Sequence, residues 1–230
     1  MILAARQLHC SRAHDLPEPT VLHDISLGFP RGSLTMLCGP PGCGKNLLLR
    51  VLGLLSMPDS GEVILHGQPT STLAAAERAA IRSREFGYVF AESFLLPAFS
   101  VIENIAMPLF KVFGMNSEEA RARAEKWLEF TGLSGEAETP ASELSTALAS
   151  RIAFARALAH EPEILLVEKL DANAEQQTQL HFLSLLQSLR EDFGTTVILT
   201  ASTRSLAAFT DRVIEMDSGA VQYDSHPVAT

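Results

Sequence analysis

The segment Gly39-Pro-Pro-Gly-Cys-Gly-Lys-Asn46 has the residue types and the spacing of a loop that binds phosphate groups, except at its last position. Glycine lets successive backbone N–H groups turn toward one anion, and the dipole of the following helix adds to the attraction. The ammonium group of Lys45 supplies a point charge for the outer phosphates. The residues expected to hold a nucleotide here are Gly39, Pro40, Pro41, Gly42, Cys43, Gly44, Lys45 and Asn46.

Asn46 stands where this kind of loop has serine or threonine, whose hydroxyl group ligates Mg²⁺. An amide oxygen can also bind a metal ion, but the asparagine side chain is longer and its geometry differs. The sequence therefore predicts a phosphate site with a weakened Mg²⁺ site.

The loop lies between an apolar run at residues 34–38 and a helical pattern at residues 47–55, which is the strand–loop–helix context that the motif requires. Further apolar strands, expected at residues 86–90, 164–167 and 195–200, alternate with helical patterns. Unbroken apolar strands that alternate with helices are typical of a parallel sheet covered on both faces. We therefore predict an α/β fold with a mostly parallel sheet.

Residues 92–156 contain helical patterns and no expected strand, which indicates a helical lobe inserted into the α/β core. Ser117, followed by two glutamates, is the expected cap of the second helix of this lobe. The chain is then one domain over residues 1–230, with a core at 1–91 and 157–230.

The composition of the chain limits the kinds of partner and the cellular compartment that we expect. The formal net charge of −9 argues against nucleic acid, because contacts to phosphates need a basic face. No apolar run approaches the length of a membrane span. The amino-terminal residues lack the charge and apolar pattern of a signal peptide, and three scattered cysteines favour a reducing compartment. We expect a cytoplasmic protein.

A second block identifies a resemblance. Ala141-Ser-Glu-Leu-Ser145, followed by the helical pattern of residues 151–158, resembles the signature helix of the nucleotide-binding subunit of ATP-binding cassette (ABC) transporters. Shorter matches at residues 67–69, 95–97 and 103–109 resemble the lipoprotein-releasing and macrolide-exporter branch. The resemblance covers essentially the whole chain. It implies a P-loop NTPase core with an antiparallel β-subdomain at its amino terminus.

The resemblance also implies two ATP molecules held between two subunits, each by the phosphate loop of one and the signature of the other. Arg12 falls near the place of the aromatic residue that stacks on adenine, where its guanidinium plane can stack or simply be solvated. Ser145 keeps its family identity, but Thr146 and Ala147 replace the two signature glycines. Their side chains then face the γ-phosphate of the opposite site.

Four further positions of the site are altered relative to the family. Ala91 replaces a glutamine that binds metal and positions water, and Ser202 replaces the switch histidine. Glu168 replaces the metal-binding aspartate, one methylene longer, and Lys169 replaces the glutamate that polarises the attacking water. An ammonium group has donors and no acceptor, so it cannot act as that base.

Two interpretations of the catalytic positions remain. In the first, the chain binds ATP but hydrolyses it slowly or not at all, since phosphoryl transfer needs these groups jointly. In the second, it is an active ABC ATPase with atypical motifs that powers export or lipoprotein release. Both imply a membrane permease as partner, a position on the inner face of the plasma membrane through that permease, and a dimer. The dimer is a homodimer or a heterodimer with an intact ABC subunit.

The segment Phe94-Leu-Leu-Pro-Ala-Phe99 also allows two readings, because its apolar side chains fit either the core of the helical lobe or a groove for a permease helix. The only tryptophan, Trp127, is expected in the core of the lobe. The seven histidines show no metal-ligand spacing, and His66 is expected in a turn.

Overall fold

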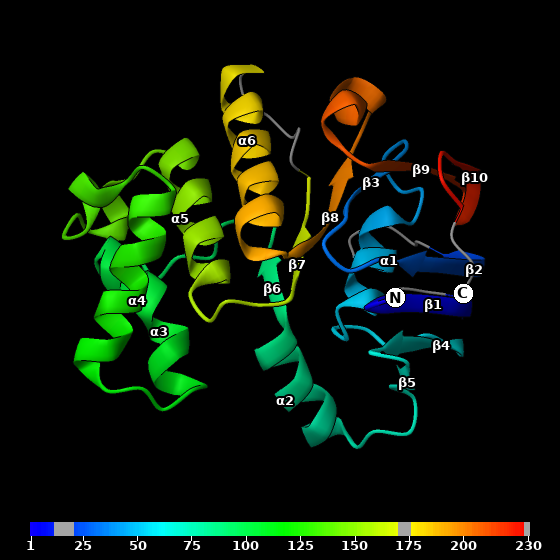
Figure 1. Cartoon of the computed structure of the whole chain (residues 1–230), viewed down its shortest axis with the longest axis horizontal. Coiled ribbons are helices and arrows are strands. Elements are labelled where there is room, and N and C mark those ends of the chain that lie inside the picture. The colour runs from blue at the N-terminus through cyan, green and yellow to red at the C-terminus, as the bar shows by residue number, and fades with distance from the viewer. Residues whose placement is uncertain (12–20, 170–175, 228–230) are drawn as a thin grey trace.

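The computed structural model describes residues 1–11, 21–169 and 176–227. Its centre is a six-stranded sheet with the strand order β10-β9-β3-β8-β7-β6 (Figure 1). All neighbouring pairs are parallel except the hairpin of β9 and β10. The strands are β3 (Leu34–Cys38), β6 (Phe86–Val89), β7 (Ile164–Val167), β8 (Thr196–Ala201), β9 (Arg212–Asp217) and β10 (Ala220–Asp224).

A second sheet contains the amino-terminal strands and is antiparallel, in the order β2-β1-β4-β5. Its strands are β1 (Leu3–Cys10), β2 (Leu22–Phe29), β4 (Ser60–Leu65) and β5 (Gln68–Pro69). The two sheets confirm the predicted fold class, a mostly parallel core with an antiparallel β-subdomain.

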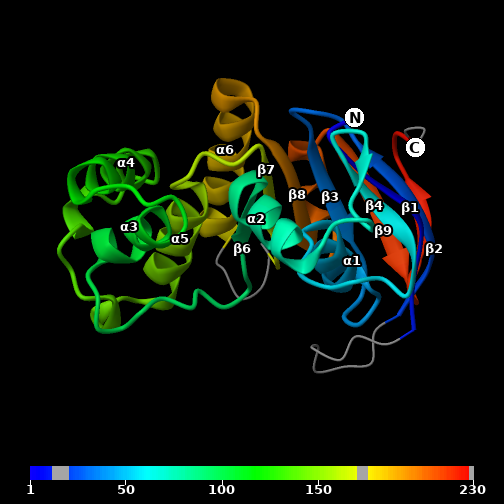
Figure 2. The ribbon, with the colours of Figure 1, turned by 90° about the horizontal axis from the view of Figure 1, so that it is seen from below.

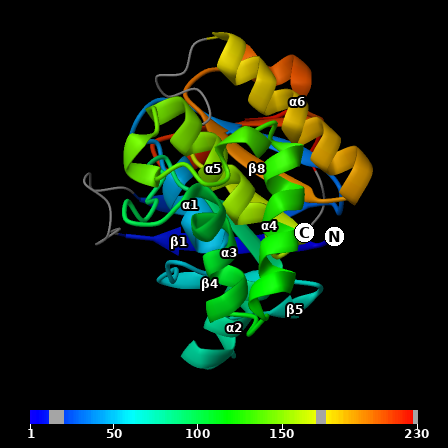
Figure 3. The ribbon, with the colours of Figure 1, turned by 90° about the vertical axis from the view of Figure 1, so that its left-hand side faces the viewer.

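The two faces of the large sheet belong to two hydrophobic cores, because side chains alternate along each strand. Ile164 and Leu166 of β7 pack in the core shared with helix α1 (Lys45–Leu52) and the antiparallel sheet. Leu165 and Val167 pack in the other core, together with helix α6 (Gln176–Phe193). Figures 2 and 3 show α1 and α6 on opposite sides of the sheet.

Three helices pack on one another at the end of the molecule farthest from the antiparallel sheet (Figures 1 and 2). They are α3 (Val101–Lys111), α4 (Ser117–Phe130) and α5 (Thr146–Leu158). Trp127 of α4 is buried in this region, as predicted. Helix α2 (Ala75–Glu85) precedes β6, and three short 3₁₀ segments cover Ser134–Glu136, Ala141–Glu143 and Arg204–Phe209.

The predicted cap of α4 was wrong by one residue. The side chain of Asn116 accepts a hydrogen bond from the backbone N–H of Glu119 at 3.0 Å, and Ser117 is the first residue of the helix. Asn and Ser are equally good caps, so the sequence offers two adjacent candidates. The other predicted elements are present with ends that differ by one or a few residues. No helix in the described ranges is long and apolar enough to cross a membrane.

Candidate nucleotide site

The strand order brings most of the predicted site residues to one edge of the large sheet. β3, β8, β7 and β6 are neighbours and parallel, so their carboxyl ends lie together. The phosphate loop follows β3, Ser202 follows β8, Glu168 and Lys169 follow β7, and Ala91 lies just beyond β6. Ligands of open α/β sheets bind at this edge.

The glycines of the loop have backbone angles that side chains disfavour. Gly39, Gly42 and Gly44 have φ of 149°, 76° and 102°. A Cβ atom on Gly39 would lie 2.1 Å from the carbonyl oxygen of Met216, and one on Gly44 would lie 2.9 Å from that of Val21. A side chain at position 39 or 44 would therefore force the loop out of this shape.

Lys45 is the first residue of α1, and it is 6% exposed. Its Nζ atom donates hydrogen bonds to the carbonyl oxygens of Gly39 at 2.9 Å and Pro40 at 3.0 Å. The side chain thus folds back over the loop and holds its charge there. A tight loop, a helix amino terminus and this ammonium group together fit the phosphates of a nucleotide.

Asn46, the next residue, has a buried side-chain oxygen, Oδ1, with no hydrogen-bond partner among the described residues. A buried polar atom without a partner is costly. This acceptor would suit a metal ion or a water molecule, so Asn46 fits Mg²⁺ as one neutral ligand.

Glu168 is buried, and both of its carboxylate oxygens already accept hydrogen bonds. Oε1 accepts from Arg50 Nε at 3.4 Å and from the Tyr88 hydroxyl at 3.0 Å. Oε2 accepts from the backbone N–H of Ala91 at 3.4 Å. Burial, together with the charge of Glu168, raises the pKa of Tyr88 well above its ordinary value, so its hydroxyl keeps the proton that it donates.

Sequence reasoning did not find Arg50 or Tyr88. A signal existed, because Arg50 lies one helical turn after Asn46 in an otherwise apolar stretch, and Tyr88 is the polar member of an apolar strand. Their meeting with Glu168 depends on the packing of α1 against the sheet, which spacing alone does not give.

Lys169 is exposed and has a left-handed backbone with φ of 50°, which is uncommon for a residue other than glycine. Its backbone N–H donates to Thr200 Oγ1 of β8 at 2.9 Å. This bond ties the end of β7 to β8 close to Ser202, which is exposed. Strained backbone of this kind gathers at functional sites.

The signature residues lie apart from the loop, at the start of α5. Ser145 caps α5 and accepts from the Leu148 N–H at 3.4 Å, while Thr146 and Ala147 form its exposed first turn. Figures 1 and 2 show α5 and α1 on opposite sides of β6 and β7. Arg12, which the resemblance places near the adenine, lies outside the described residues.

The segment that follows β6 presents apolar side chains to solvent. Phe94 is 61% exposed, Leu96 and Phe99 are exposed, and Leu95 packs against the core. Arg156 of α5 fixes this segment by donating to the carbonyl oxygens of Ser93 at 2.6 Å and Phe94 at 2.8 Å. Leu95 therefore fits the interpretation as core of the helical lobe, whereas a groove for a permease helix at the exposed side chains stays a prediction.

Comparison with known proteins identifies the family. The ABC transporter family matches residues 22–169, more than half of the chain, and this range contains both the phosphate loop and the start of α5. The chain belongs to the ABC transporter family. The predicted resemblance is confirmed.

Relatives of this ABC protein include the lipoprotein-releasing system ATP-binding protein LolD of Bordetella pertussis, which is 37% identical over 89% of this chain and 88% of its own length. The LolD protein of Bacteroides thetaiotaomicron is 34% identical over 89% of this chain and 93% of its own length. Among solved structures, the dimeric structure of a bacterial ABC transporter cassette matches with a TM-score of 0.89 and 28% identity over the full length of both chains. A dimeric cassette in a post-hydrolysis state, bound to ADP and phosphate, matches with a TM-score of 0.88.

Proposed function

We propose that this ABC protein binds ATP through its phosphate loop and couples to a membrane permease, and that its rate of ATP hydrolysis is strongly reduced or nil. The observation that carries the proposal is Lys169, an exposed cation two residues after the end of β7, where the family resemblance implies a carboxylate base. A donor-only group cannot orient water or take its proton. Ala91 and Ser202 remove two further catalytic groups.

The contacts of Glu168 support a weak Mg²⁺ site. Mg²⁺ is usually held by one or two carboxylates together with the phosphates. Arg50 supplies a positive charge to Glu168, and three donors use both of its oxygens. A metal ion would have to share Glu168 with these three donors and would lie near the charges of Lys45 and Arg50. We infer that nucleotide binding depends little on Mg²⁺, with Asn46 as the open metal ligand.

The partner is proposed from two observations. Phe94, Leu96 and Phe99 expose apolar area on a segment that Arg156 holds in place, and exposed apolar patches mark contact sites. Relatives are named as ATP-binding proteins of a lipoprotein-releasing system. We therefore place this protein on the inner face of the plasma membrane, bound to a permease and paired with a copy of itself or with an intact ABC subunit.

The alternative is an active ABC ATPase with atypical motifs that powers lipoprotein release or export. This alternative is favoured by the sequence identity of 37%, over 89% of this chain, to a relative named as the ATP-binding protein of a lipoprotein-releasing system. This alternative requires Asn46 and Glu168 to hold Mg²⁺ firmly and another group to replace the missing base.

Equilibrium binding of ATP in Mg²⁺ and in EDTA, combined with a Lys45→Ala variant, tests the proposed binding mode. We expect binding in both buffers, with affinities within a fewfold of each other. Lys45→Ala should weaken binding by about tenfold to a hundredfold, the size expected for a hydrogen bond to a charged group. Lys111→Ala, which removes an exposed cation from the end of α3, is the matched control and should bind as the parent does.

Tight binding that strictly requires Mg²⁺ would contradict the weakened metal site and favour the active ATPase. Equal binding by the parent and by Lys45→Ala would show that the phosphate loop is not the binding site. Thermal unfolding of each variant checks that a loss of binding is not a loss of fold.

A further inference from the structure

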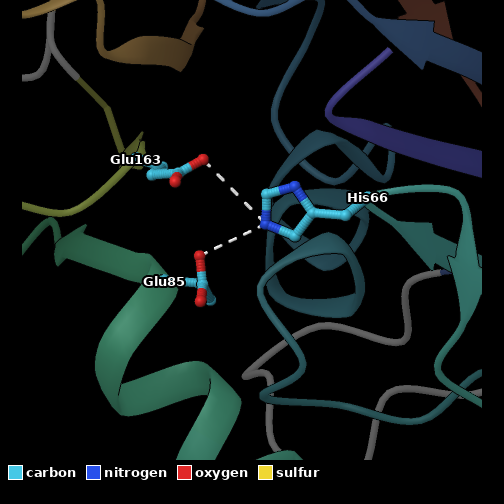
Figure 4. Close-up of side chains that lie close together, drawn as sticks. All are labelled: His66, Glu85 and Glu163. Carbon is cyan, nitrogen blue, oxygen red and sulfur yellow. Dashed lines mark hydrogen bonds and ion pairs between the residues drawn. The ribbon is translucent and has the colours of Figure 1, made fainter.

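A second group of chemically active side chains lies at the opposite end of the parallel strands, near their amino ends. Figure 4 shows that the imidazole ring of His66 points between the carboxylates of Glu85 and Glu163. Its Nε2 atom lies 3.3 Å from Glu85 Oε2 and 3.9 Å from Glu163 Oε2. One ligand atom from each of the three residues lies within 4.8 Å of the other two.

The backbone fixes this arrangement from three directions. Glu85 is the last residue of α2 and Glu163 precedes β7, so each stands one residue before a strand. The residues that follow them, Phe86 and Ile164, are partners in the β6–β7 ladder. The two carboxylates therefore start neighbouring strands, and the sheet holds them together despite their like charge.

His66 approaches from the antiparallel sheet. It follows β4 in a turn, with a left-handed φ of 50°, and its backbone N–H donates to the Ile2 carbonyl oxygen at 2.8 Å. The turn thus projects the ring away from its own sheet toward α2 and β7.

The charges of this group are only partly balanced. Arg31 Nη1 contacts Glu163 Oε2 at 2.5 Å and offsets one of the two carboxylates. The imidazole nitrogen faces both carboxylates, so a proton or another cation must lie between them for the contacts to be favourable. The side chains of all four residues are between 31% and 57% exposed, so solutes can reach them.

These distances suit a small transition-metal ion. Bonds from Zn²⁺ to histidine nitrogen and carboxylate oxygen of about 2.0–2.2 Å, in a tetrahedron, place two ligand atoms roughly 3.4 Å apart. The His66–Glu85 distance is already 3.3 Å, and the His66–Glu163 distance of 3.9 Å would have to shorten by a movement that exposed side chains can make. Imidazole with carboxylates favours Zn²⁺ over Mg²⁺, which prefers oxygen ligands alone.

We propose that His66, Glu85 and Glu163 form a binding site for a divalent transition-metal ion of the Zn²⁺ type, with water as a further ligand. The ion would join the β4–β5 turn to the amino ends of β6 and β7, and so link the antiparallel sheet to the large sheet. Because the metal ion would bind the folded state and not the unfolded state, it would raise the free energy of unfolding. The site does not depend on the proposed nucleotide function.

Calorimetric titration of the full chain with Zn²⁺, and separately with Mg²⁺, tests the site in the absence of nucleotide. We expect saturable binding of Zn²⁺, no comparable binding of Mg²⁺, and a rise in the unfolding temperature with Zn²⁺. His66→Ala and Glu85→Gln should each weaken Zn²⁺ binding by about tenfold or more. His23→Ala, an exposed histidine on β2, is the matched control and should leave binding unchanged.

Arg31→Ala separates a metal site from a plain ion-pair cluster. Because it frees Glu163 from its competing cation, it should tighten Zn²⁺ binding severalfold. Absence of saturable Zn²⁺ binding, or equal binding by His66→Ala and the parent, would overturn the proposal. Unchanged affinity in Arg31→Ala would remove Glu163 from the ligand set and contradict the three-residue site. These positions are exposed, and unfolding curves without metal check that each variant is folded.

Discussion

The phosphate loop and the ends of β7 and β8 lie at the same edge of one sheet, yet they differ in how closely their residues match those that the family resemblance implies. The loop retains two tightly packed glycines, Gly39 and Gly44, and a lysine that folds back over it. The neighbouring strand ends carry Lys169 and Ser202 where the resemblance implies a base and a switch histidine. Binding and catalysis use separate residues on one scaffold, so one can be lost while the other is kept.

The packing of the two regions explains why they tolerate change so differently. Replacing Gly39 would bring a Cβ atom into contact with the backbone of β9. Lys169 is exposed, and its hydrogen bond to Thr200 comes from the backbone N–H and does not involve the lysine side chain. A substitution in the phosphate loop therefore disturbs the packing of the fold. The side chain at position 169 can change with little effect on stability.

The largest expected effect comes from Gly39→Ala, which disrupts the shape of the phosphate loop. The added Cβ would lie 2.1 Å from Met216 O and 2.8 Å from Cys43 Sγ. We expect destabilisation by about 1–3 kcal/mol or more, which lowers the unfolding temperature by several degrees, together with loss of ATP binding.

Gly114→Ala is the matched control for Gly39→Ala. Gly114 also has a positive φ, 64°, but a Cβ there meets nothing within 4 Å. It should lower stability by only about 1 kcal/mol, the cost of the left-handed backbone, and leave ATP binding unchanged. Equal effects of the two substitutions in thermal unfolding and binding would mean that close packing of the loop is not what matters.

A smaller effect is expected from Arg50→Met, which tests whether the charge on Glu168 is already satisfied within the protein. Removing Arg50 leaves a buried carboxylate with the Tyr88 hydroxyl and the Ala91 N–H as donors. We expect ATP to bind severalfold more tightly in Mg²⁺ than in EDTA, because a metal ion then supplies the missing charge.

Two comparisons make the Arg50 result interpretable. Arg84→Met removes an exposed arginine of α2 and should keep the parent's weak response to Mg²⁺. Arg50→Met/Glu168→Gln removes both charges and should lose the Mg²⁺ response that Arg50→Met gained. If Arg50→Met responds to Mg²⁺ as the parent does, Glu168 is not the group that limits metal binding.

A mixed dimer of this chain with an intact ABC subunit would separate the contribution of the phosphate loop from that of the signature. One composite site would then join the partner's loop and base to the signature of this chain, where Thr146 and Ala147 form the exposed first turn of α5. Changing both residues to glycine should raise hydrolysis by the mixed complex severalfold. Lys45→Ala in the same complex should change it little. If Lys45→Ala abolishes turnover and the glycine pair has no effect, the active site has been assigned to the wrong half.

The smallest effect is expected from Lys169→Glu. It restores a carboxylate at one position, but Ala91, Ser202 and the signature stay altered, and such groups act as a unit. Steady-state ATP hydrolysis should stay near background. Recovery of substantial turnover from this single change would show that the other positions are not limiting.

Much of the fold could be predicted from the sequence, because apolar strands, a glycine-rich loop and helical patterns follow one another in a recognisable order. The Mg²⁺-related chemistry could be predicted only in part. Asn46 and Glu168 are visible as altered motif residues, but the contacts of Glu168 with Arg50 and Tyr88 arise from packing between α1 and β6.

The cluster at His66 was missed for a related reason. Its carboxylates come from the ends of α2 and of the segment before β7, and only the pairing of β6 with β7 brings them together. A search for metal ligands by spacing along the chain cannot find residues that a parallel sheet places side by side.

Single-turnover hydrolysis tests the central claim, that this protein binds ATP but hydrolyses it very slowly or not at all. The purified chain, in excess over radiolabelled ATP and with Mg²⁺ present, is sampled for ADP over time beside a mixture without protein. The account predicts that ATP is bound and that ADP forms no faster than in the protein-free mixture. Conversion of the bound ATP at an ordinary enzymatic rate, on the order of 1–10³ s⁻¹, would contradict it and establish the active ATPase.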